Sequence, residues 1–306
     1  MGSHAGYLIG DHMEKIIESD VSVIIPAYNE AHNIGKMVAH ILVLHPDFEI
    51  IVIDDGSTDG TGEIAGEAGA IVYKHPYNIG NGAAIKSGIR IASGQVLVFM
   101  DADGQHDPAD LGQLIQHFPE FDMVVGARPE GTQDSKIRAL GNRIYNCLTS
   151  YVTNFAIRDL TSGFRAVKSD LARNLLYLLP NTHSYPTTLT LGMLRSGKSV
   201  KYVKINAQSR KTGKSDIRII RDGVRFSMII VRICTFYSPL KVFLPTSVGL
   251  FLVGLAYYGY TFFTAGRFTN MSALLFTTSI LIFMLGLISE QISQMRFEKS
   301  EGDRFV

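Results

Sequence analysis

Short apolar runs alternate with helical segments between residues 21 and 126, and this alternation limits the fold more than any other feature of the chain. The runs predicted to be strands are Val21–Ile25, Glu49–Ile53, Ala70–Lys74, Val96–Met100 and Asp122–Gly126. Strands that alternate with helices form a parallel, doubly wound α/β sheet. Because the crossovers are right-handed, the carboxyl ends of these strands should meet at one edge, where such sheets bind ligands.

Acidic residues directly follow two of the predicted strands. Val96–Met100 runs into Asp101-Ala102-Asp103, and the second strand runs into Asp54-Asp55. Mg²⁺ and Mn²⁺ prefer oxygen ligands and use one or two protein carboxylates together with substrate phosphates. Each acidic turn alone would also suit an ordinary strand end, but two on one sheet edge indicate a nucleotide site with a metal ion.

The usual nucleotide-binding glycine patterns are missing from their expected places. Neither GxGxxG nor GxxxxGK[ST] follows the first strand. Asn78–Gly82 resembles a glycine loop, but we expect it to serve close helix–strand packing, with phosphate binding as the alternative.

The net charge argues against a nucleic-acid partner, and the first residues are not expected to belong to the fold. The formal net charge of +1 gives no field that would attract nucleic acid, so no nucleic-acid partner is expected. Cys147 and Cys234 have no metal-ligand spacing. Residues 1–19 are polar and begin with Met-Gly-Ser-His, so we expect a leader outside the fold.

Two long apolar stretches dominate the C-terminal part. Val242–Ala265 and Met271–Ser289 contain no charged residue, and each approaches the roughly 20 residues that cross a bilayer. We expect a transmembrane hairpin over residues 241–296 and a tail at 297–306, with two buried core helices as the alternative. Basic residues flank both spans, which places the preceding domain and both termini in the cytoplasm.

A basic segment precedes the first span. Four arginines spaced three, four and seven residues apart share one helical face: Arg218, Arg221, Arg225 and Arg232. Apolar residues accompany them, so residues 216–240 are predicted to lie in the membrane interface, with a soluble amphipathic helix as the alternative. Ser135–Phe155 shows the same pattern more weakly. The loop Ser209–Ser215 is basic and suits an anionic ligand, or is a solvated loop.

Three motifs in order resemble the family 2 inverting glycosyltransferases, which have the GT-A fold. They are Ile24-Ile25-Pro26-Ala27-Tyr28-Asn29-Glu30, Asp54-Asp55-Gly56-Ser57-Thr58-Asp59-Gly60 and Asp101-Ala102-Asp103-Gly104-Gln105. Asp159–Arg165 is similar to the branch that contains dolichol-phosphate mannose synthases and polyprenyl-phosphate glycosyltransferases. The resemblance covers about Val21–Leu240. It implies a GT-A, doubly wound, mostly parallel sheet as the catalytic domain at 20–215, followed by the interfacial and transmembrane helices.

The resemblance also implies a donor site. The nucleotide diphosphate should lie among ten residues, with Arg128 at a phosphate: Pro26, Ala27, Tyr28, Glu30, Asp54, Asp55, Gly56, Asp101, Ala102 and Arg128. Mg²⁺ or Mn²⁺ should be held by Asp101 and Asp103, with Gln105 as a third candidate ligand. We assign the acceptor phosphate to basic side chains: Arg138, Arg165, Arg210 and Lys214.

Catalytic roles are predicted for Asp103, Asp159 and Arg165. Some relatives carry an acidic residue immediately before the Phe-Arg pair, where this chain has Gly163. Asp159 is then the nearest candidate for a base, or else a carboxylate paired with Arg158 or Arg165.

The implied reaction transfers one sugar from a nucleotide-diphosphate sugar to a polyprenyl or dolichyl phosphate, with inversion. A phosphate monoester has a second pKa of about 6, so its oxygen is largely deprotonated at neutral pH. We therefore expect Asp159 to orient or balance charge rather than to abstract a proton. A uridine donor is favoured, and a GDP-mannose-dependent dolichyl-phosphate mannose synthase is the alternative.

Two other classes of protein remain as alternatives. A processive polysaccharide synthase needs more spans and a Gln-x-x-Arg-Trp sequence, and this chain has no tryptophan. A catalytically silent membrane scaffold of the same fold is the remaining class. The expected partners are the sugar nucleotide, the lipid phosphate and the bilayer, and the sequence leaves the oligomeric state open, a homo-oligomer included.

Overall fold

The computed structural model describes residues 20–128, 143–205 and 238–302, apart from residues 119, 144, 145, 148 and 183, with side chains as far as residue 295. Several predicted features lie outside the described residues: the leader, the basic loop at 209–215, nearly all of the interfacial segment at 216–240, and the first part of the weaker one at 135–155. The predicted domain boundaries stay a prediction.

One seven-stranded sheet forms the centre of the N-terminal domain, in the order β3-β2-β1-β4-β6-β5-β7. Its strands are β1 (Val21–Ala27), β2 (Glu49–Asp54), β3 (Ile71–Lys74), β4 (Val96–Phe99), β5 (Met123–Ala127), β6 (Arg165–Lys168) and β7 (Val200–Lys204). β6 is antiparallel to β4 and β5, and the other pairs are parallel. The five predicted strands and the mostly parallel, doubly wound sheet are confirmed.

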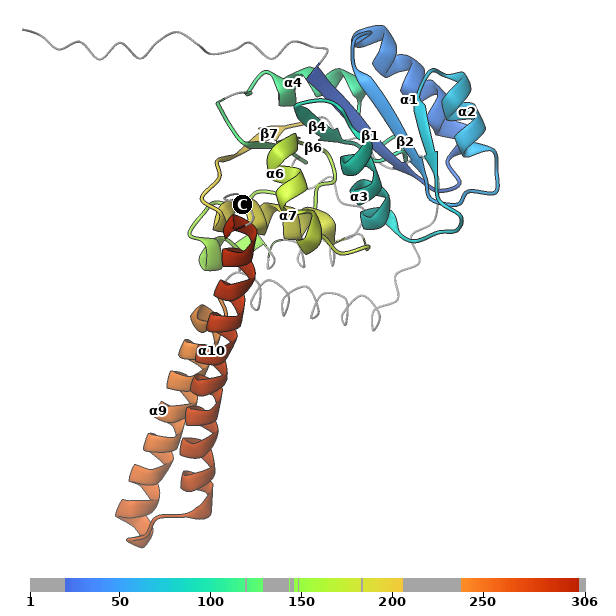
Figure 1. The fold of residues 1–306 in the computed structure, drawn as a ribbon. Helices are drawn as coiled ribbons and strands as arrows, with labels where there is room; N and C mark the ends of the chain where they lie inside the picture. Colours follow the sequence, from blue (N-terminus) through green and yellow to red (C-terminus); the bar gives the residue numbers. More distant parts are fainter. Residues whose placement is uncertain are drawn as a thin grey trace, which may run out of the picture.

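Helices cover both faces of this sheet, because side chains alternate along each strand. Val23, Ile25 and Val52 pack with α1 (Ala31–Leu44), α2 (Thr61–Glu67) and α4 (Leu111–Ile115) in one core. Ile24 and Ile51 pack on the opposite face with α3 (Asn81–Ile91), α6 (Ser169–Asn174) and α7 (Tyr185–Arg195). Figure 1 shows these helices around the sheet. The domain also contains the 3-10 turns η2 (Pro108–Asp110) and η3 (Leu176–Leu178).

The glycine-rich start of α3 packs closely against the loop before α7, so the strand predicted as its neighbour is wrong. A Cβ on Gly82 would lie 2.1 Å from the Pro180 carbonyl oxygen, and one on Gly80 would lie 2.4 Å from that of Asn181. Gly80 also has a φ of +125°, which side-chain-bearing residues rarely adopt. Further along α3, a Cβ on Gly88 would meet the Ile24 side chain at 2.3 Å.

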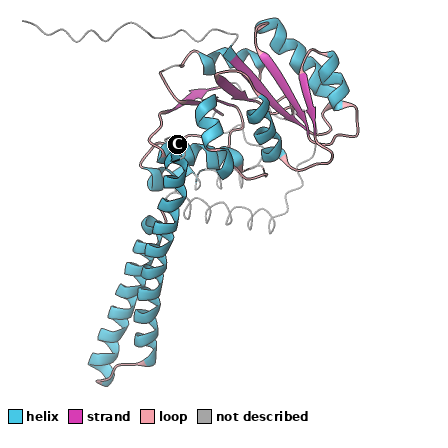
Figure 2. Cartoon of the chain, in the orientation of Figure 1, coloured by secondary structure: helices cyan, strands magenta, loops and turns pink. Residues whose placement is uncertain are grey.

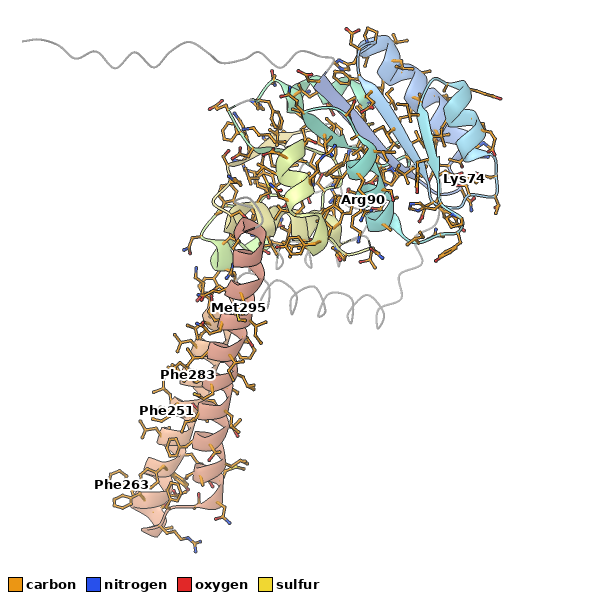
Figure 3. All side chains as sticks on the ribbon, viewed as in Figure 1. Lys74, Arg90, Phe251, Phe263, Phe283 and Met295 are labelled. Carbon is orange, nitrogen blue, oxygen red and sulfur yellow. The ribbon has the colours of Figure 1, made fainter. Side chains whose placement is uncertain are left out.

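Two long helices, α9 (Leu240–Ala265) and α10 (Asn270–Gly302), pair side by side and extend away from the sheet (Figure 2). By length and composition, Leu240–Ala265 and Asn270–Met295 are candidate membrane spans, with mean hydropathies of 1.7 and 2.2. Only 11% and 17% of their most apolar windows are buried, whereas a core helix of a soluble domain is mostly buried. Figure 3 shows Phe251 and Phe263 among the side chains on this exposed apolar surface.

Small residues line the contact between the two helices, which allows close approach. A Cβ on Gly286 would lie 2.6 Å from Phe243 Cβ, and one on Gly254 would lie 3.1 Å from Leu275 Cβ. The Ser279 hydroxyl donates to the Ser247 carbonyl over 2.9 Å. Gly266, with a φ of +62°, ends α9.

Candidate active site

The loops after β1 and β2 are bonded to each other and form one unit. Side chains of residues 57–61 accept from three consecutive backbone amides: Asn29 to Ser57 Oγ (2.9 Å), Glu30 to Thr61 Oγ1 (2.9 Å) and Ala31 to Asp59 Oδ2 (3.1 Å). In the other direction, Asn29 Oδ1 accepts a hydrogen bond from the Thr58 amide at 3.0 Å. Asn29 has a φ of +55°, a conformation that asparagine tolerates better than most residues. The two motifs are thus held in fixed relative positions.

Asp54 ends β2 with a buried carboxylate that is only half used. Its Oδ1 accepts from the Ser57 amide at 2.8 Å. Its Oδ2 has no hydrogen-bond partner among the described residues, although Lys74 Nζ lies 3.6 Å away. Buried polar atoms are almost always hydrogen-bonded, so this oxygen is suited to a donor group on a ligand. A Cβ on Gly62 would lie 2.8 Å from it, so glycine leaves the space open.

Asp55 is engaged quite differently, although it is adjacent. Its carboxylate accepts from the amides of Ile79 (3.0 Å) and Gly80 (2.8 Å) and lies 2.6 Å from His75 Nδ1. His75 Nε2 in turn lies 2.9 Å from Ser87 Oγ. Asp55 therefore holds the loop between β3 and α3. His75 escaped the sequence reasoning because a single histidine after an edge strand carries no pattern.

The acidic turn after β4 lies in a charged cluster. Asp101 and Asp103 are partly exposed, and Asp103 Oδ1 accepts from the Gln105 amide at 3.1 Å across a turn at Gly104 (φ +72°). His106 is buried and stacks on Phe164 with ring centroids 4.9 Å apart. Burial lowers the pKa of His106, against the opposing effect of Asp101 and Asp103. His106 was also missed, because its burial depends on Phe164, far along the chain.

Gly163 lies directly behind Asp101. A Cβ at position 163 would lie 2.5 Å from Asp101 Oδ2. In this chain any side chain there would displace the carboxylate, which gives a physical reason for the missing acidic residue.

Arg165 does not reach the surface, and its predicted contact with an acceptor phosphate does not fit this position. The side chain is 0% exposed. Its guanidinium donates to the carbonyl of Ser162 through two nitrogens, to the carbonyl of Pro186 at 2.8 Å and to Thr190 Oγ1 at 2.9 Å. Arg165 therefore acts as a positioning residue: it holds the segment that backs Asp101.

Arg128 and Asp159 form a two-pronged ion pair. Arg128 Nε lies 2.8 Å from Asp159 Oδ2, Arg128 Nη2 lies 3.2 Å from Oδ1, and Nη2 also donates to Thr161 Oγ1 at 2.9 Å. Burial alone would raise the pKa of Asp159, but the hydrogen bonds and charge of Arg128 hold it below its usual range. The partner of Asp159 is thus Arg128, and neither Arg158 nor Arg165. A quarter of the Arg128 side chain, 26%, stays exposed.

Comparison with known proteins identifies the domain. The model of glycosyl transferase family 2 matches residues 22–176, half of the chain. The chain belongs to glycosyl transferase family 2. It is a glycosyltransferase, as predicted, and a second model, the GtrB C-terminal hairpin, matches residues 238–295 of this glycosyltransferase.

Relatives with curated names extend the comparison. The glycosyltransferase is 32% identical over 209 residues to polyprenol monophosphomannose synthase of Mycolicibacterium smegmatis, covering 63% of this chain and 79% of that protein. It is 26% identical over 299 residues to undecaprenyl-phosphate 4-deoxy-4-formamido-L-arabinose transferase of Pectobacterium carotovorum subsp. carotovorum, covering 90% and 89%.

A solved structure shares the fold. Glucosyl-3-phosphoglycerate synthase from Mycobacterium tuberculosis, crystallised with Mn²⁺, uridine diphosphate and glucosyl-3-phosphoglycerate, superposes with a TM-score of 0.55. The match has 19% identity and covers 70% of this chain and 77% of that one. At this identity the likeness shows the fold alone, and the predicted GT-A fold is confirmed.

The residues after β4 fit a hard divalent cation of the kind predicted for this glycosyltransferase. Asp101 and Asp103 offer carboxylates on one tight turn, both partly exposed. Among the described residues, no group of three or more His, Cys, Asp or Glu side chains is arranged as a closed metal cage. Mg²⁺ and Mn²⁺ suit such an open site, because a nucleotide's phosphate oxygens complete their coordination.

The remaining predicted site residues are buried in or beside the sheet, lie on the joined loops, or fall outside the described residues. Pro26 and Ala27 are buried in β1, Tyr28 is 48% exposed, and Glu30 and Gly56 lie on the joined loops. Ala102 is buried between the two carboxylates. Arg138, Arg210 and Lys214 lie outside the described residues.

Proposed function

We propose that this glycosyltransferase moves one sugar from a nucleotide-diphosphate sugar to the phosphate of a polyprenyl phosphate. The observation that carries the proposal is a family 2 catalytic domain continuing into two long apolar helices that are little buried. Named relatives that act on polyprenol or undecaprenyl phosphates support the same acceptor class. A lipid acceptor needs an enzyme at the membrane, and the hairpin supplies an anchor.

The donor would lie along the sheet edge from β2 to β4. Asp54 Oδ2 would accept from the base, and the partly exposed Tyr28 and Glu30 would border the nucleoside. Asp101 and Asp103, with Gln105 as a third candidate, would hold Mg²⁺ or Mn²⁺. The ion, when bound, neutralises charge that develops on the departing nucleotide diphosphate. We favour a uridine donor, and a GDP-mannose donor is the alternative.

Arg128 would bind a phosphate of the donor, and Asp159 would hold Arg128 in the orientation that this contact needs. The exposed quarter of Arg128 would contact a phosphate, and Asp159 would fix the guanidinium plane through its two-pronged bond. A carboxylate with a lowered pKa is a weak base. The acceptor phosphate oxygen, already deprotonated, would attack the anomeric carbon as the bond to the nucleotide diphosphate breaks, which inverts that centre.

The acceptor would approach from the membrane side. Arg138, Arg210 and Lys214 stay predicted contacts of its phosphate, and reversing one of these charges should raise the KM for the lipid rather than that for the donor. The basic flanks of the hairpin support a cytoplasmic catalytic domain with both termini on the same side.

Transfer of label tests this proposal directly. Full-length protein in vesicles would receive radiolabelled UDP-sugars or GDP-mannose and a polyprenyl phosphate, with and without Mn²⁺. Metal-dependent label in the lipid fraction is expected from one donor. Asp101→Asn should reduce it by about a hundredfold or more, as losses of charge-stabilising groups do. Asp107→Asn is the matched control, because Asp107 only caps η2 and asparagine also caps well. Label in no lipid with any donor would overturn the proposal and favour a silent scaffold.

A further inference from the structure

Lys241 joins the apolar hairpin to the catalytic domain. It is the second residue of α9. Its Nζ donates to the Val152 carbonyl at 3.0 Å and to Asn154 Oδ1 at 3.2 Å. Those acceptors lie where the helical segment at 149–153 ends, and Asn154 turns the chain with a φ of +54°. A lysine at the carboxyl end of a helix is favoured by the unpaired carbonyls and by the helix dipole.

Glu290 holds the same end of the hairpin together. This residue of α10 accepts from the Leu240 amide at 3.2 Å and from Ser238 Oγ at 3.3 Å through Oε2. A carboxylate at the start of a helix satisfies amides that have no partner within the helix. Lys241 is therefore mounted on a helix start that is itself fixed to α10. We call Lys241, Glu290, Val152 and Asn154 the hairpin clasp.

The clasp is close to the active site along the chain. Asn146 donates to the Arg158 carbonyl at 2.7 Å and accepts from the Leu160 amide at 3.3 Å. Ser150 Oγ accepts from the Ile157 amide at 3.0 Å. These bonds tie the segment after Asn154 back onto the helix that the clasp holds. That segment ends in Asp159, the partner of Arg128, only five residues after Asn154.

The position of Lys241 at the end of an apolar stretch explains why its side chain extends toward the catalytic domain. From Val242 to Ala265 no charged residue follows it. A lysine at the end of an apolar span extends its ammonium toward the polar side. Here the polar partner is the catalytic domain itself.

We propose that the hairpin clasp sets the height of the Arg128–Asp159 pair above the membrane, so that the phosphate of a membrane-embedded lipid reaches the donor. The proposal rests on the proposed function. Lys241 is a positioning residue in it and touches no substrate. An acceptor short enough to leave the membrane can reach the site without this alignment, whereas a long one cannot.

The test compares two acceptors with full-length protein in vesicles. One acceptor is an undecaprenyl-length phosphate, and the other is a two-isoprene phosphate in solution. Lys241→Met should raise the KM for the long acceptor about tenfold, the effect of one charged hydrogen bond, and leave the donor KM and the short acceptor near wild type. Lys241→Arg should restore most of the activity. Asn154→Gly keeps the turn and loses one acceptor atom, so about a threefold effect is expected.

The control is Lys36→Met, on the exposed side of α1 in the same domain. An equal loss for both acceptors would indicate a local folding defect and overturn the proposal, as would an unchanged long-acceptor KM. If wild type transfers sugar to neither acceptor, the proposed function fails instead. The clasp is then judged by hydrogen exchange in vesicles, where Lys241→Met should raise exchange at residues 150–160 relative to Lys36→Met. Unchanged exchange there would overturn it.

Discussion

Different interactions stabilise the sheet edge and the apolar hairpin: hydrogen bonds hold the loops of the edge, and close helix packing holds the hairpin. At the sheet edge, each loop has several hydrogen bonds, and even a buried arginine has every bond directed at backbone or hydroxyl groups. In the hairpin, glycines and serines allow close contact over a long apolar surface, with few polar links. A single change should therefore disturb the edge far more than the hairpin, because an unsatisfied buried group costs more than a slightly wider helix contact.

Arg165→Met should give the largest effect. It removes the donors to three buried acceptors and should lower the free energy of unfolding by about 3 kcal/mol. Arg90→Met is the control, on an exposed residue of α3 (Figure 3). Chemical unfolding monitored by far-UV circular dichroism measures the free energy of unfolding of both variants. A loss no larger than that of the control would mean that Arg165 does not support the edge.

Gly163→Ala should come next and should act on catalysis. The added Cβ would meet Asp101 Oδ2 at 2.5 Å and push the carboxylate aside. Small displacements of reacting groups cost about a hundredfold in rate, so kcat/KM should fall by about that factor. Gly112→Ala is the matched control, since a Cβ there has nothing within 4 Å. Equal activities of the two variants would remove Gly163 from the site.

Asp159→Asn should reduce kcat by about tenfold, in the range of lost positioning rather than lost acid–base catalysis. A loss above about a thousandfold at pH 8 would instead identify a base.

The pKa of Asp159 is held below the unfolded value of about 3.9, so the folded state binds fewer protons in that range. Its contribution to stability is complete above that value and disappears as the pH falls through the lower, folded pKa. Wild-type and Asp159→Asn unfolding curves should therefore converge only in strong acid.

Gly254→Leu should give the smallest effect. The larger side chain meets Leu275 and parts the helices, but Gly254 lies 13 residues along α9 from Lys241, so the hairpin clasp and the catalytic domain are untouched and kcat should change less than about fivefold. Gly249→Leu, with open space around it, is the control. A loss as large as that of Gly163→Ala would contradict the contrast between the two regions.

The sequence carried the parts of this molecule that depend on local pattern. Short apolar runs predicted β1 to β5, and uncharged stretches predicted α9 and α10. β6 was not predicted, because four residues with two apolar ones give no period to detect. The burial of Arg165 escaped for a different reason: its partners Pro186 and Thr190 lie 21 and 25 residues away. The site residues could be named from motifs, but which carboxylate keeps an oxygen without a hydrogen bond, Asp54 or Asp55, depends on His75 and the loop before α3.

The half-used carboxylate of Asp54 has a practical consequence. Its buried Oδ2 has only the Lys74 ammonium 3.6 Å away among the described residues, so a ligand group that donates a hydrogen bond to it would gain a buried, charge-assisted contact. Any small molecule that donates a hydrogen bond there and binds only the folded state stabilises it by RT ln(1 + [L]/Kd), which rises with its affinity. Melting curves recorded across a panel of nucleosides would then rank bases by fit before any sugar transfer is assayed, and a preparation kept in the best one should have the longest shelf life.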